Sequence, residues 1–321
     1  MRRALIRTAG IAASAVLVLW GAATLAFLAF RIIPGDAVSV MLGPQAKVSE
    51  AVKDALRAEL GLDRPPLEQY LGYVGGLLRG DLGTSYQLRM PVSEVIARQL
   101  GPTLQLTALA MLLAVIIAFA VALLARRGAA RTAVSAVELI VLSSPVFWIG
   151  ILLLAVFAFG LGWFPVAGTR SPATVVLPAV TLALPVAALI GQVLRDGMDD
   201  AERQPFAETV RSRGGGPARM VLRHSLRHGA AGALTMTAYL IGSLLGGAVL
   251  VETVFARPGL GRATLTAIVD RDLPVVAGVI MLSAAVFVVV NVVVELLHPV
   301  IDPRLRARAA AFEAPAIEER R

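Results

Sequence analysis

Long apolar runs alternate with short polar segments along most of the chain. Six runs are long enough to cross the roughly 30 Å hydrocarbon core of a membrane as helices, and backbone groups in lipid must be satisfied within their own segment. These runs lie at residues 9–30, 102–125, 135–161, 174–194, 230–255 and 275–297. The pattern therefore predicts an all-α integral membrane protein with six transmembrane helices.

The segment between the first two spans, residues 31–101, has a helical pattern of its own. Apolar positions recur every four residues at Val48, Val52, Leu56 and Leu60, which predicts one amphipathic helix. The stretch from Leu67 to Leu78 predicts a second. Such helices could cap the spans at the membrane surface or offer a docking surface to an external partner, and the sequence favours neither strongly.

A polar island at residues 195–228 separates the fourth and fifth spans. Pro205 is expected to begin a short helix and Gly214 to end it, because proline is favoured at the first helical position and glycine just beyond the last. Gly214-Gly215-Gly216 forms a flexible joint, and Pro217 opens a second helix. A solvated linker does not need this helical order, so we expect the island to dock onto a cytosolic partner.

Composition agrees with a membrane protein. Of the 321 residues, 57% are hydrophobic and 16% are charged, below the roughly 25% charged residues of a soluble domain. Cysteine is absent, which excludes a disulfide framework and a thiolate metal site. The net charge is +8, but the basic residues lie in loops and tails and form no basic face with aromatic residues. Nucleic acid is therefore not predicted as a partner.

The distribution of arginine predicts the orientation. Arginines gather in the N-terminal tail (residues 1–8), after the second span, in the 195–228 island and after the sixth span. With six spans all four groups lie on one side, which the positive-inside rule makes the cytoplasm, and residues 31–101 are extracellular. Residues 307–321 are expected to form a disordered cytoplasmic tail. The run at 9–30 is too long for the core of a signal peptide and lacks a clean cleavage site, so it is expected to be retained.

No catalytic residue and no metal ligand is predicted. A phosphate loop that contains lysine is excluded because no lysine follows residue 53. Ser143-Ser144 lacks a convincing base, and serines that pack spans explain it better than a protease nucleophile. His224 and His228 are one helical turn apart and could share a metal, but arginines crowd them and no third ligand is evident. A docking face is the favoured explanation.

Polar and proline positions inside the spans leave several explanations open. The prolines at Pro145, Pro178 and Pro185 can kink their helices, which suits a translocation path and suits ordinary packing equally well. Four polar residues lie in or near spans: Glu138, Glu252, Asn291 and Glu295. For the glutamates, which lie close to span ends, snorkelling to the interface is the cheaper arrangement, and Asn291 is expected to bond an adjacent helix. An ion-gradient-driven secondary transporter would use the glutamates as proton sites. A membrane scaffold or sensor without transport is a third class.

The island carries a recognisable motif. Glu208-Thr-Val, three residues, Gly214, nine residues and His224-Ser-Leu226 resemble the EAA loop of binding-protein-dependent ABC importer permeases. The whole chain resembles the first permease subunit of the dipeptide, oligopeptide and nickel importers over about residues 1–306. The segments that carry this resemblance include Arg31-Ile-Ile-Pro-Gly-Asp36, Gly80-Asp-Leu-Gly-Thr-Ser85, Pro102-Thr-Leu104, Ser144-Pro-Val-Phe147, Gly246-Gly-Ala-Val-Leu-Val-Glu252, Pro258-Gly-Leu-Gly261, Arg271-Asp-Leu-Pro274 and Asp302-Pro-Arg304.

The loop also departs from this subfamily. The subfamily usually has a basic residue at position 208 and a leucine after the glycine, where this chain has Glu208 and Gly215. It commonly ends the loop with Arg-Asn and a proline, where Arg227-His228-Gly229-Ala230 stands here. These departures bear on the rigidity of the loop and on its preferred ATPase.

The resemblance implies a type I ABC importer permease fold, with residues 102–306 as the permease core and the 195–228 loop supplying coupling helices to a cytosolic ATPase. The implied ATPase-coupling residues are Phe206, Glu208, Thr209, Arg211, Arg213 and Gly214. Candidates for the translocation path are Ser143, Ser144, Gln192 and Asn291.

The resemblance also implies partners and cargo. The implied partners are a second permease subunit in a heterodimer, two cytosolic P-loop ATPase subunits or domains, an extracellular solute-binding protein and membrane lipid. ATP and Mg belong to the ATPase, and no cofactor is assigned to this chain. The implied location is the bacterial cytoplasmic membrane, with both termini inside. A short peptide is the commonest cargo implied, while a nickel chelate, a glutathione-like thiol and an opine- or sugar-type solute remain open.

Overall fold

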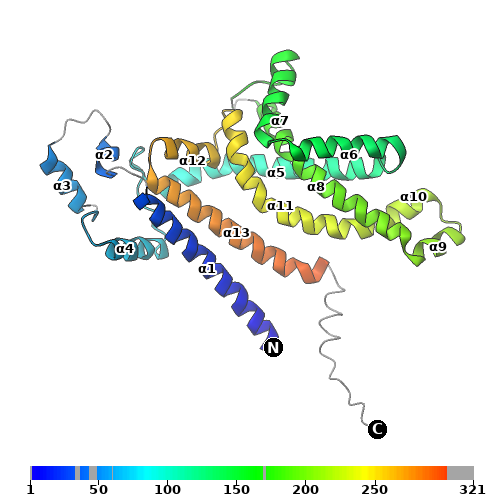
Figure 1. The fold of residues 1–321 in the computed structure, drawn as a ribbon, viewed down its shortest axis with the longest axis horizontal. Coiled ribbons are helices and arrows are strands. Elements are labelled where there is room, and N and C mark those ends of the chain that lie inside the picture. The colour runs from blue at the N-terminus through cyan, green and yellow to red at the C-terminus, as the bar shows by residue number, and fades with distance from the viewer. Residues whose placement is uncertain (1, 33–36, 43–48, 60, 169–170, 302–321) are drawn as a thin grey trace, which may run out of the picture. The chain divides into compact units, whose positions relative to one another are not determined.

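The computed structural model describes residues 2–32, 37–42, 49–59, 61–168 and 171–301, which form helices joined by short connections (Figure 1). The all-α class predicted from the apolar pattern is confirmed. The chain divides into two compact units. Unit 1 comprises Met1–Gln105 and Ala256–Val288, and unit 2 comprises Leu106–Phe255 and Val289–Arg321.

Unit 1 is built around the start of a long helix, α5. Its helices are α1 (Arg2–Ile32), α2 (Ala37–Leu42), α3 (Glu50–Glu59), α4 (Pro66–Leu78), the first part of α5 (Val92–Leu124), α12 (Leu260–Val269) and the first part of α13 (Leu273–Ile301). Val92 and Val275 are buried in its core. Gly278 permits the close contact with α5, because a Cβ at this position would clash with the side chain of Val92. Helix α4 is joined to α1 by a 2.8 Å hydrogen bond between the hydroxyls of Thr24 and Tyr70.

Unit 2 is built around α8. Its helices are the rest of α5, α6 (Gly128–Ser143), α7 (Val146–Leu153), the π-helix η1 (Leu154–Gly160), the 3-10 helix η2 (Pro172–Val175), α8 (Val176–Arg203), α9 (Pro205–Ser212), α10 (Pro217–Met220), the π-helix η3 (Val221–Ser225) and α11 (Leu226–Val254). Helix α11 packs along α8 (Figure 1). A Cβ on Gly197 would lie 2.7 Å from the Cα of Gly229, and one on Gly229 would lie 2.5 Å from the carbonyl oxygen of Leu194. Two glycines thus allow the close backbone approach that is common between membrane helices.

Five helical segments of the described chain are long and apolar enough to cross a membrane. They are Ala9–Ala29, Val92–Leu124, Pro172–Arg203, Pro217–Val254 and Leu273–Val293. The most apolar window of the α8 segment is 61% buried, whereas no other candidate exceeds 28%. Helix α8 is therefore the central span of unit 2, and the other candidates leave apolar surface for lipid or for another subunit.

The third predicted span, residues 135–161, is not one straight helix. Helices α6 and α7 meet at an angle of 110°, so the number of spans reaches six only if this bent pair counts as one. Ser144 is extended (φ −94°, ψ 137°), as a residue before proline tends to be, and Pro145 has no N–H to continue the helix. By contrast, Pro185 lies inside α8 and Pro178 lies in its first turn, and neither interrupts the helix.

The helical pattern of the 31–101 segment is confirmed by α3 and α4. Leu67 and Leu71 of α4 remain exposed. Val48, Leu60 and the tail at 307–321 lie outside the described residues, as does the side chain of Glu295.

Candidate functional site

The polar island forms the two short helices that its sequence predicts. Helix α9 begins at Pro205, and α10 begins at Pro217. Gly214 follows the end of α9 with φ +74°, in the left-handed region that favours glycine, and its N–H donates to the carbonyl oxygen of Arg211 at 3.0 Å. The island is shorter than predicted at its start, because α8 continues as a helix to Arg203.

A second glycine makes the turn after α9 tight. The N–H of Gly215 donates to the carbonyl oxygen of Val210 at 2.9 Å. A Cβ at position 215 would lie 2.7 Å from that same oxygen. Glycine in place of the leucine expected from the resemblance therefore fits this turn, and a larger residue would require the backbone to move.

The inner face of α9 packs on the second half of the loop. The ring of Phe206 stacks on His228 with a centroid distance of 5.3 Å and lies 6.2 Å from His224. These three side chains, with Thr209 and Arg213 among others, line a groove of about 390 Å³. The histidine pair thus packs against an aromatic ring, and the described residues contain no group of three metal-binding side chains.

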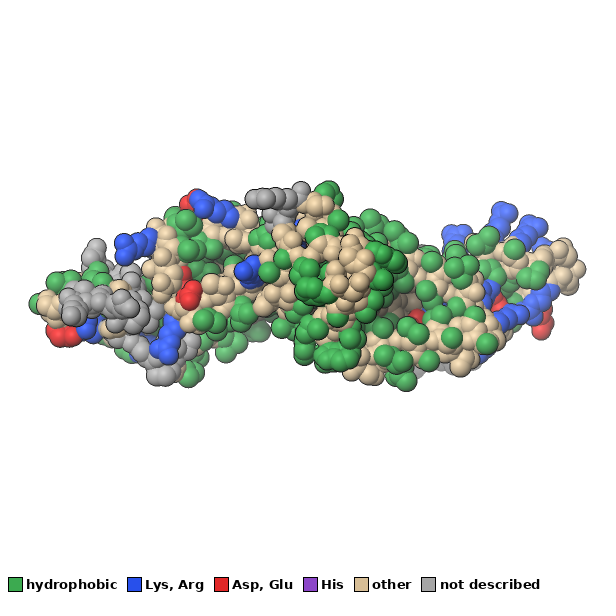
Figure 2. All heavy atoms as spheres, turned by 90° about the horizontal axis from the view of Figure 1, so that it is seen from above, with side chains coloured by type: hydrophobic (Ala, Val, Ile, Leu, Met, Phe, Trp, Pro, Cys, Tyr) green, Lys and Arg blue, Asp and Glu red, His purple; other side chains and the backbone are tan. Residues whose placement is uncertain are grey.

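The outer face of α9 is polar and exposed. Glu208 and Arg211 of α9 are exposed. Thr209 and Arg213, which also line the groove, and Gly214, which follows the helix, are exposed as well. Figure 2 shows basic side chains, which are all arginine in this part of the chain, gathered around the end of the unit formed by α9 and α10. Glu208 lies in the first turn of α9, where a negative charge is favoured by the helix dipole. The loop therefore combines a packed inner face with a charged outer face that is available to a partner.

A row of ion pairs joins α8 to α6 and to the connection between α5 and α6, and we call it the ion-pair ladder. It consists of Arg126 and Arg127 with Glu202, Arg131 with Asp199, and Glu138 with Arg195. The α8 members are spaced at i, i+4 and i+7, which places them on one face of the helix. The ladder was not predicted from the sequence, although the i, i+4, i+7 spacing on α8 was a signal for one charged face.

The inner rung of the ladder, the pair of Glu138 with Arg195, contradicts a prediction made from the sequence. Glu138 is paired with Arg195, and their side chains are only 9% and 6% exposed. The expectation that Glu138 snorkels to the membrane interface is wrong, because its charge is neutralised inside the unit. Glu252 is also completely buried, so it does not snorkel either. A Cβ at Gly191 would lie 3.3 Å from both Glu138 Oε1 and Arg195 Nη1, so glycine leaves the space that the pair occupies.

The four candidates for the translocation path are spread over three helices. Ser143 and Ser144 lie at the end of α6, Gln192 lies on α8 and Asn291 on α13. The Ser144 hydroxyl donates to the carbonyl oxygen of Ile140 at 2.7 Å, a local contact that agrees with a packing role. Ser143 and Asn291 are exposed, and Gln192 is half-buried.

In unit 1 two of the segments that carry the resemblance meet around one buried carboxylate. Asp272 is 2% exposed and accepts hydrogen bonds from the hydroxyl of Ser85 and from the backbone N–H groups of Tyr86 (3.0 Å) and Gln87 (3.3 Å). Burial, and then the charge of Asp272, raise the pKa of the Tyr86 phenol above its usual value. Gly80–Ser85 and Arg271–Pro274 are therefore held together by Asp272.

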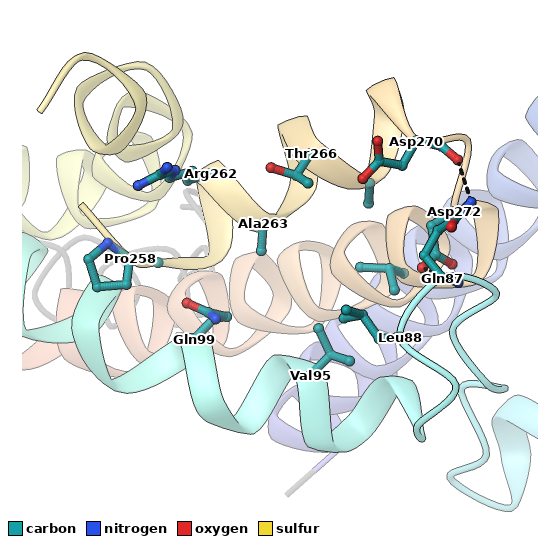
Figure 3. Close-up of a pocket in the computed structure, with 13 residues that line it drawn as sticks. Gln87, Leu88, Val95, Gln99, Pro258, Arg262, Ala263, Thr266, Asp270 and Asp272 are labelled. Atoms are coloured by element: carbon teal, nitrogen blue, oxygen red, sulfur yellow. Dashed lines mark hydrogen bonds between the residues drawn. The ribbon is translucent and has the colours of Figure 1, made fainter. Parts of the chain in front are cut away.

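A groove of about 320 Å³ lies beside this carboxylate (Figure 3). Figure 3 shows Gln99 and Val95 on α5 facing α12, from which Ala263 points into the groove, and Arg262 and Thr266 on the rim. The amide of Gln87 donates to the carbonyl oxygen of Asp270 at 3.1 Å and closes one end.

Two further motif segments meet at the other end of this groove. The backbone N–H of Leu260 donates to the hydroxyl of Thr103 at 2.8 Å, and Arg257 donates to the side-chain oxygen of Gln105 at 3.0 Å. Pro102–Leu104 and Pro258–Gly261 are thereby joined.

Comparison with known families agrees with this arrangement. Residues 110–307 match the family described as the binding-protein-dependent transport system inner membrane component, and residues 1–107 match the N-terminal part of such membrane components. The chain belongs to this family. It is thus a membrane permease component of an ABC importer and is not itself an enzyme.

Individual relatives cover nearly the whole chain. The glutathione transport system permease protein GsiC of Escherichia coli O6:H1 is 36% identical over 290 residues, which are 88% of this chain and 92% of that protein. A Brucella abortus (strain 2308) protein named as a candidate peptide transport system permease is 36% identical over 305 residues, which are 92% of this chain and 96% of that protein. The permease is therefore similar along its length to proteins named for peptide and for glutathione transport.

The fold has a counterpart among solved structures. The crystal structure of an amino acid ABC transporter with histidines matches with a TM-score of 0.50 and 17% identity, and the match covers 64% of this chain and 93% of that chain. The permease thus has the type I importer fold that the resemblance implies.

Proposed function

We propose that this permease forms half of the translocation path of an ATP-driven importer of short peptides and that the loop at 205–228 docks onto the cytosolic ATPase. The observation that carries the docking proposal is the two-faced geometry of α9. Phe206 and His228 hold its inner face, while Glu208 and Arg211 remain on the exposed outer face. A fixed helix with exposed charged side chains can transmit force to and from a partner.

The proposed assembly follows from the family and from the distribution of charge. A second permease subunit completes the path, two P-loop ATPases bind ATP and Mg, and an external solute-binding protein delivers the cargo. By the positive-inside rule, the arginine-rich loops support a cytoplasmic position for both termini and for α9. Closure of the ATPase pair moves α9 and shifts the permease pair between inward-open and outward-open states, each stabilised by the ligands that bind it better.

Short peptides are the proposed cargo because relatives that match almost the full chain are named for peptide transport. The similarity to a glutathione permease supports a closely related alternative, since glutathione is itself a small peptide. Uptake of labelled di- and tripeptides and of labelled glutathione by the reconstituted importer separates the two.

The pairing of Glu138 with Arg195 favours an ATP-driven importer over an ion-driven carrier. A proton site needs a carboxyl group that protons can reach, whereas the Glu138 carboxylate is buried and ion-paired with Arg195. In an ion-driven carrier, Glu138→Gln would abolish uptake that depends on a proton gradient. In the proposed importer, uptake follows ATP and is insensitive to collapse of that gradient.

The docking proposal is tested by co-purification of the ATPase with the tagged permease. We expect Glu208→Ala to weaken ATPase binding about tenfold, as for the loss of one charge-assisted hydrogen bond. The matched control is Glu94→Ala, which removes an exposed acid from the first turn of α5 in unit 1. Equal ATPase binding by wild type, Glu208→Ala and Arg211→Ala would refute the docking role of this face.

A further inference from the structure

Glu202 lies where three separate segments of unit 2 meet. Its carboxylate accepts hydrogen bonds from Arg126 and Arg127, the latter at 3.0 Å, in the connection between α5 and α6. The hydroxyl of Ser225, at the end of η3, lies 3.3 Å from the same carboxylate. Arg211 of α9 donates to the backbone carbonyl oxygen of Glu202 at 3.4 Å.

The position of Glu202 in the chain shows which segments these contacts connect. It lies three residues before α9, which begins at Pro205, whereas Ser225 immediately precedes α11. Both ends of the docking loop are therefore tied to one carboxylate. The arginines tie the same carboxylate to a connection that lies 75 and 76 residues earlier in the chain.

The surroundings of Glu202 make these contacts stronger than ordinary surface pairs. Its side chain is 15% exposed and that of Arg126 is 18% exposed, so solvent screens their attraction less than at an open surface. Ser225 is completely buried. It ends a π-helical turn, a local irregularity that is frequent at functional sites.

We propose that Glu202 is a positioning residue that transmits movement of the docking loop to the α5–α6 connection. This inference rests on the proposed docking of α9 to the ATPase. When α9 moves, both ends of the loop move against a carboxylate that also holds Arg126 and Arg127. The connection between α5 and α6 follows, and with it α6, which the ion-pair ladder joins to α8.

The test uses the complete importer reconstituted in vesicles with its binding protein. Glu202→Gln keeps the size of the side chain but removes its charge. We expect this variant to retain bound ATPase and to lose at least about fivefold in peptide imported per ATP hydrolysed, equivalent to about 1 kcal/mol of coupling. The matched control is Asp200→Asn on the same helix, which breaks an exposed 3.8 Å pair with Arg203 and should leave the ratio unchanged.

A double-mutant cycle shows whether Arg126 and Glu202 act together. If they do, Arg126→Gln combined with Glu202→Gln lowers uptake per ATP no further than Glu202→Gln alone, because coupled residues are not additive. Fully additive losses would contradict the inference. If Glu202→Gln does not accumulate in the membrane, Arg127→Gln takes its place in the comparison of uptake per ATP with wild type. The Arg127 side chain is 82% exposed, and replacing it leaves the pair between Arg126 and Glu202 in place.

The outcomes separate this inference from the docking proposal. If the Glu202→Gln variant imports as much peptide per ATP as wild type, the transmission role is overturned and the docking proposal is unaffected. Loss of the ATPase from Glu202→Gln also overturns it, because the residue would then serve docking. Failure of the wild-type permease to bind any ATPase refutes the docking proposal itself.

Discussion

The two ends of the ion-pair ladder differ in what surrounds them. The inner rung, Glu138 with Arg195, lies between two helices, and both side chains are less than 10% exposed. At the outer rung, the carboxylate of Glu202 contacts Arg126, Arg127 and the hydroxyl of Ser225, which lie on separate segments. The side chain of Arg127 is 82% exposed. A buried pair is costly to break but has one geometry, whereas a partly exposed cluster can exchange partners. The inner rung is therefore expected to stabilise the fold, and the outer rung is expected to allow movement between segments.

The largest expected effect is the loss of one member of the inner rung. Arg195→Ala leaves the Glu138 carboxylate buried without its charge partner and should lower the free energy of unfolding by about 3–5 kcal/mol. Unfolding in mixed micelles, followed by tryptophan fluorescence, measures this. The double variant Glu138→Leu/Arg195→Met should be more stable than either single replacement by alanine. A single variant as stable as wild type would remove the distinction between the two rungs.

The next largest effect on the free energy of unfolding is expected where α11 packs closely against α8. Gly229→Ala puts a methyl group against the backbone of Leu194 and should cost about 1–3 kcal/mol in the same unfolding measurement. Gly242→Ala on the same helix is the control, because a Cβ there meets nothing within 4 Å. Equal stability of the two variants would show that the contact between α8 and α11 is looser than the structure has it.

A smaller stability effect is expected at the outer rung. Glu202→Gln should change the free energy of unfolding by only about 1 kcal/mol, because the glutamine side chain keeps an oxygen that can accept hydrogen bonds from the same partners. Its effect should appear instead in uptake per ATP. A stability loss as large as that of Arg195→Ala would mean that both rungs are structural.

The smallest effect is expected where the ladder is most exposed. Arg127→Gln should change unfolding by less than about 0.5 kcal/mol, and 1 M salt should reduce even this difference, since exposed pairs are screened. Unfolding at two salt concentrations checks it. A large effect that does not depend on salt would place Arg127 with the buried pair.

The helices of this permease could be predicted from sequence because lipid forces each span to satisfy its own backbone. The turn at α9 was equally readable, since Pro205, Gly214 and Pro217 act through local backbone geometry. The 110° break was not, although Pro145 was noticed. Pro185 is the same residue type in a similar run, yet α8 passes through it, so a proline alone does not predict a break.

The ladder was missed for a different reason. Its partners are 57 to 76 residues apart, so no window of sequence contains both. The i, i+4, i+7 spacing of Arg195, Asp199 and Glu202 marked one charged face of α8, but it could not say which helix would face it. The prediction that Glu138 snorkels failed because Arg195 was assigned to the polar island at 195–228 and not to the helix that faces Glu138.

The three consecutive glycines after α9 should tolerate mutation very differently. Gly214 has open space around it but a left-handed backbone, so asparagine is the replacement it should accept most readily. Gly215 is closed by the backbone of Val210, so a saturation library should return glycine there almost alone. Gly216 has an ordinary φ of −65°, and a methyl group added there would meet nothing within 4 Å, so most residues should pass. The three glycines are therefore under three different structural constraints. The residue at position 216 should be the first to change in sequence as such loops adapt to new ATPases.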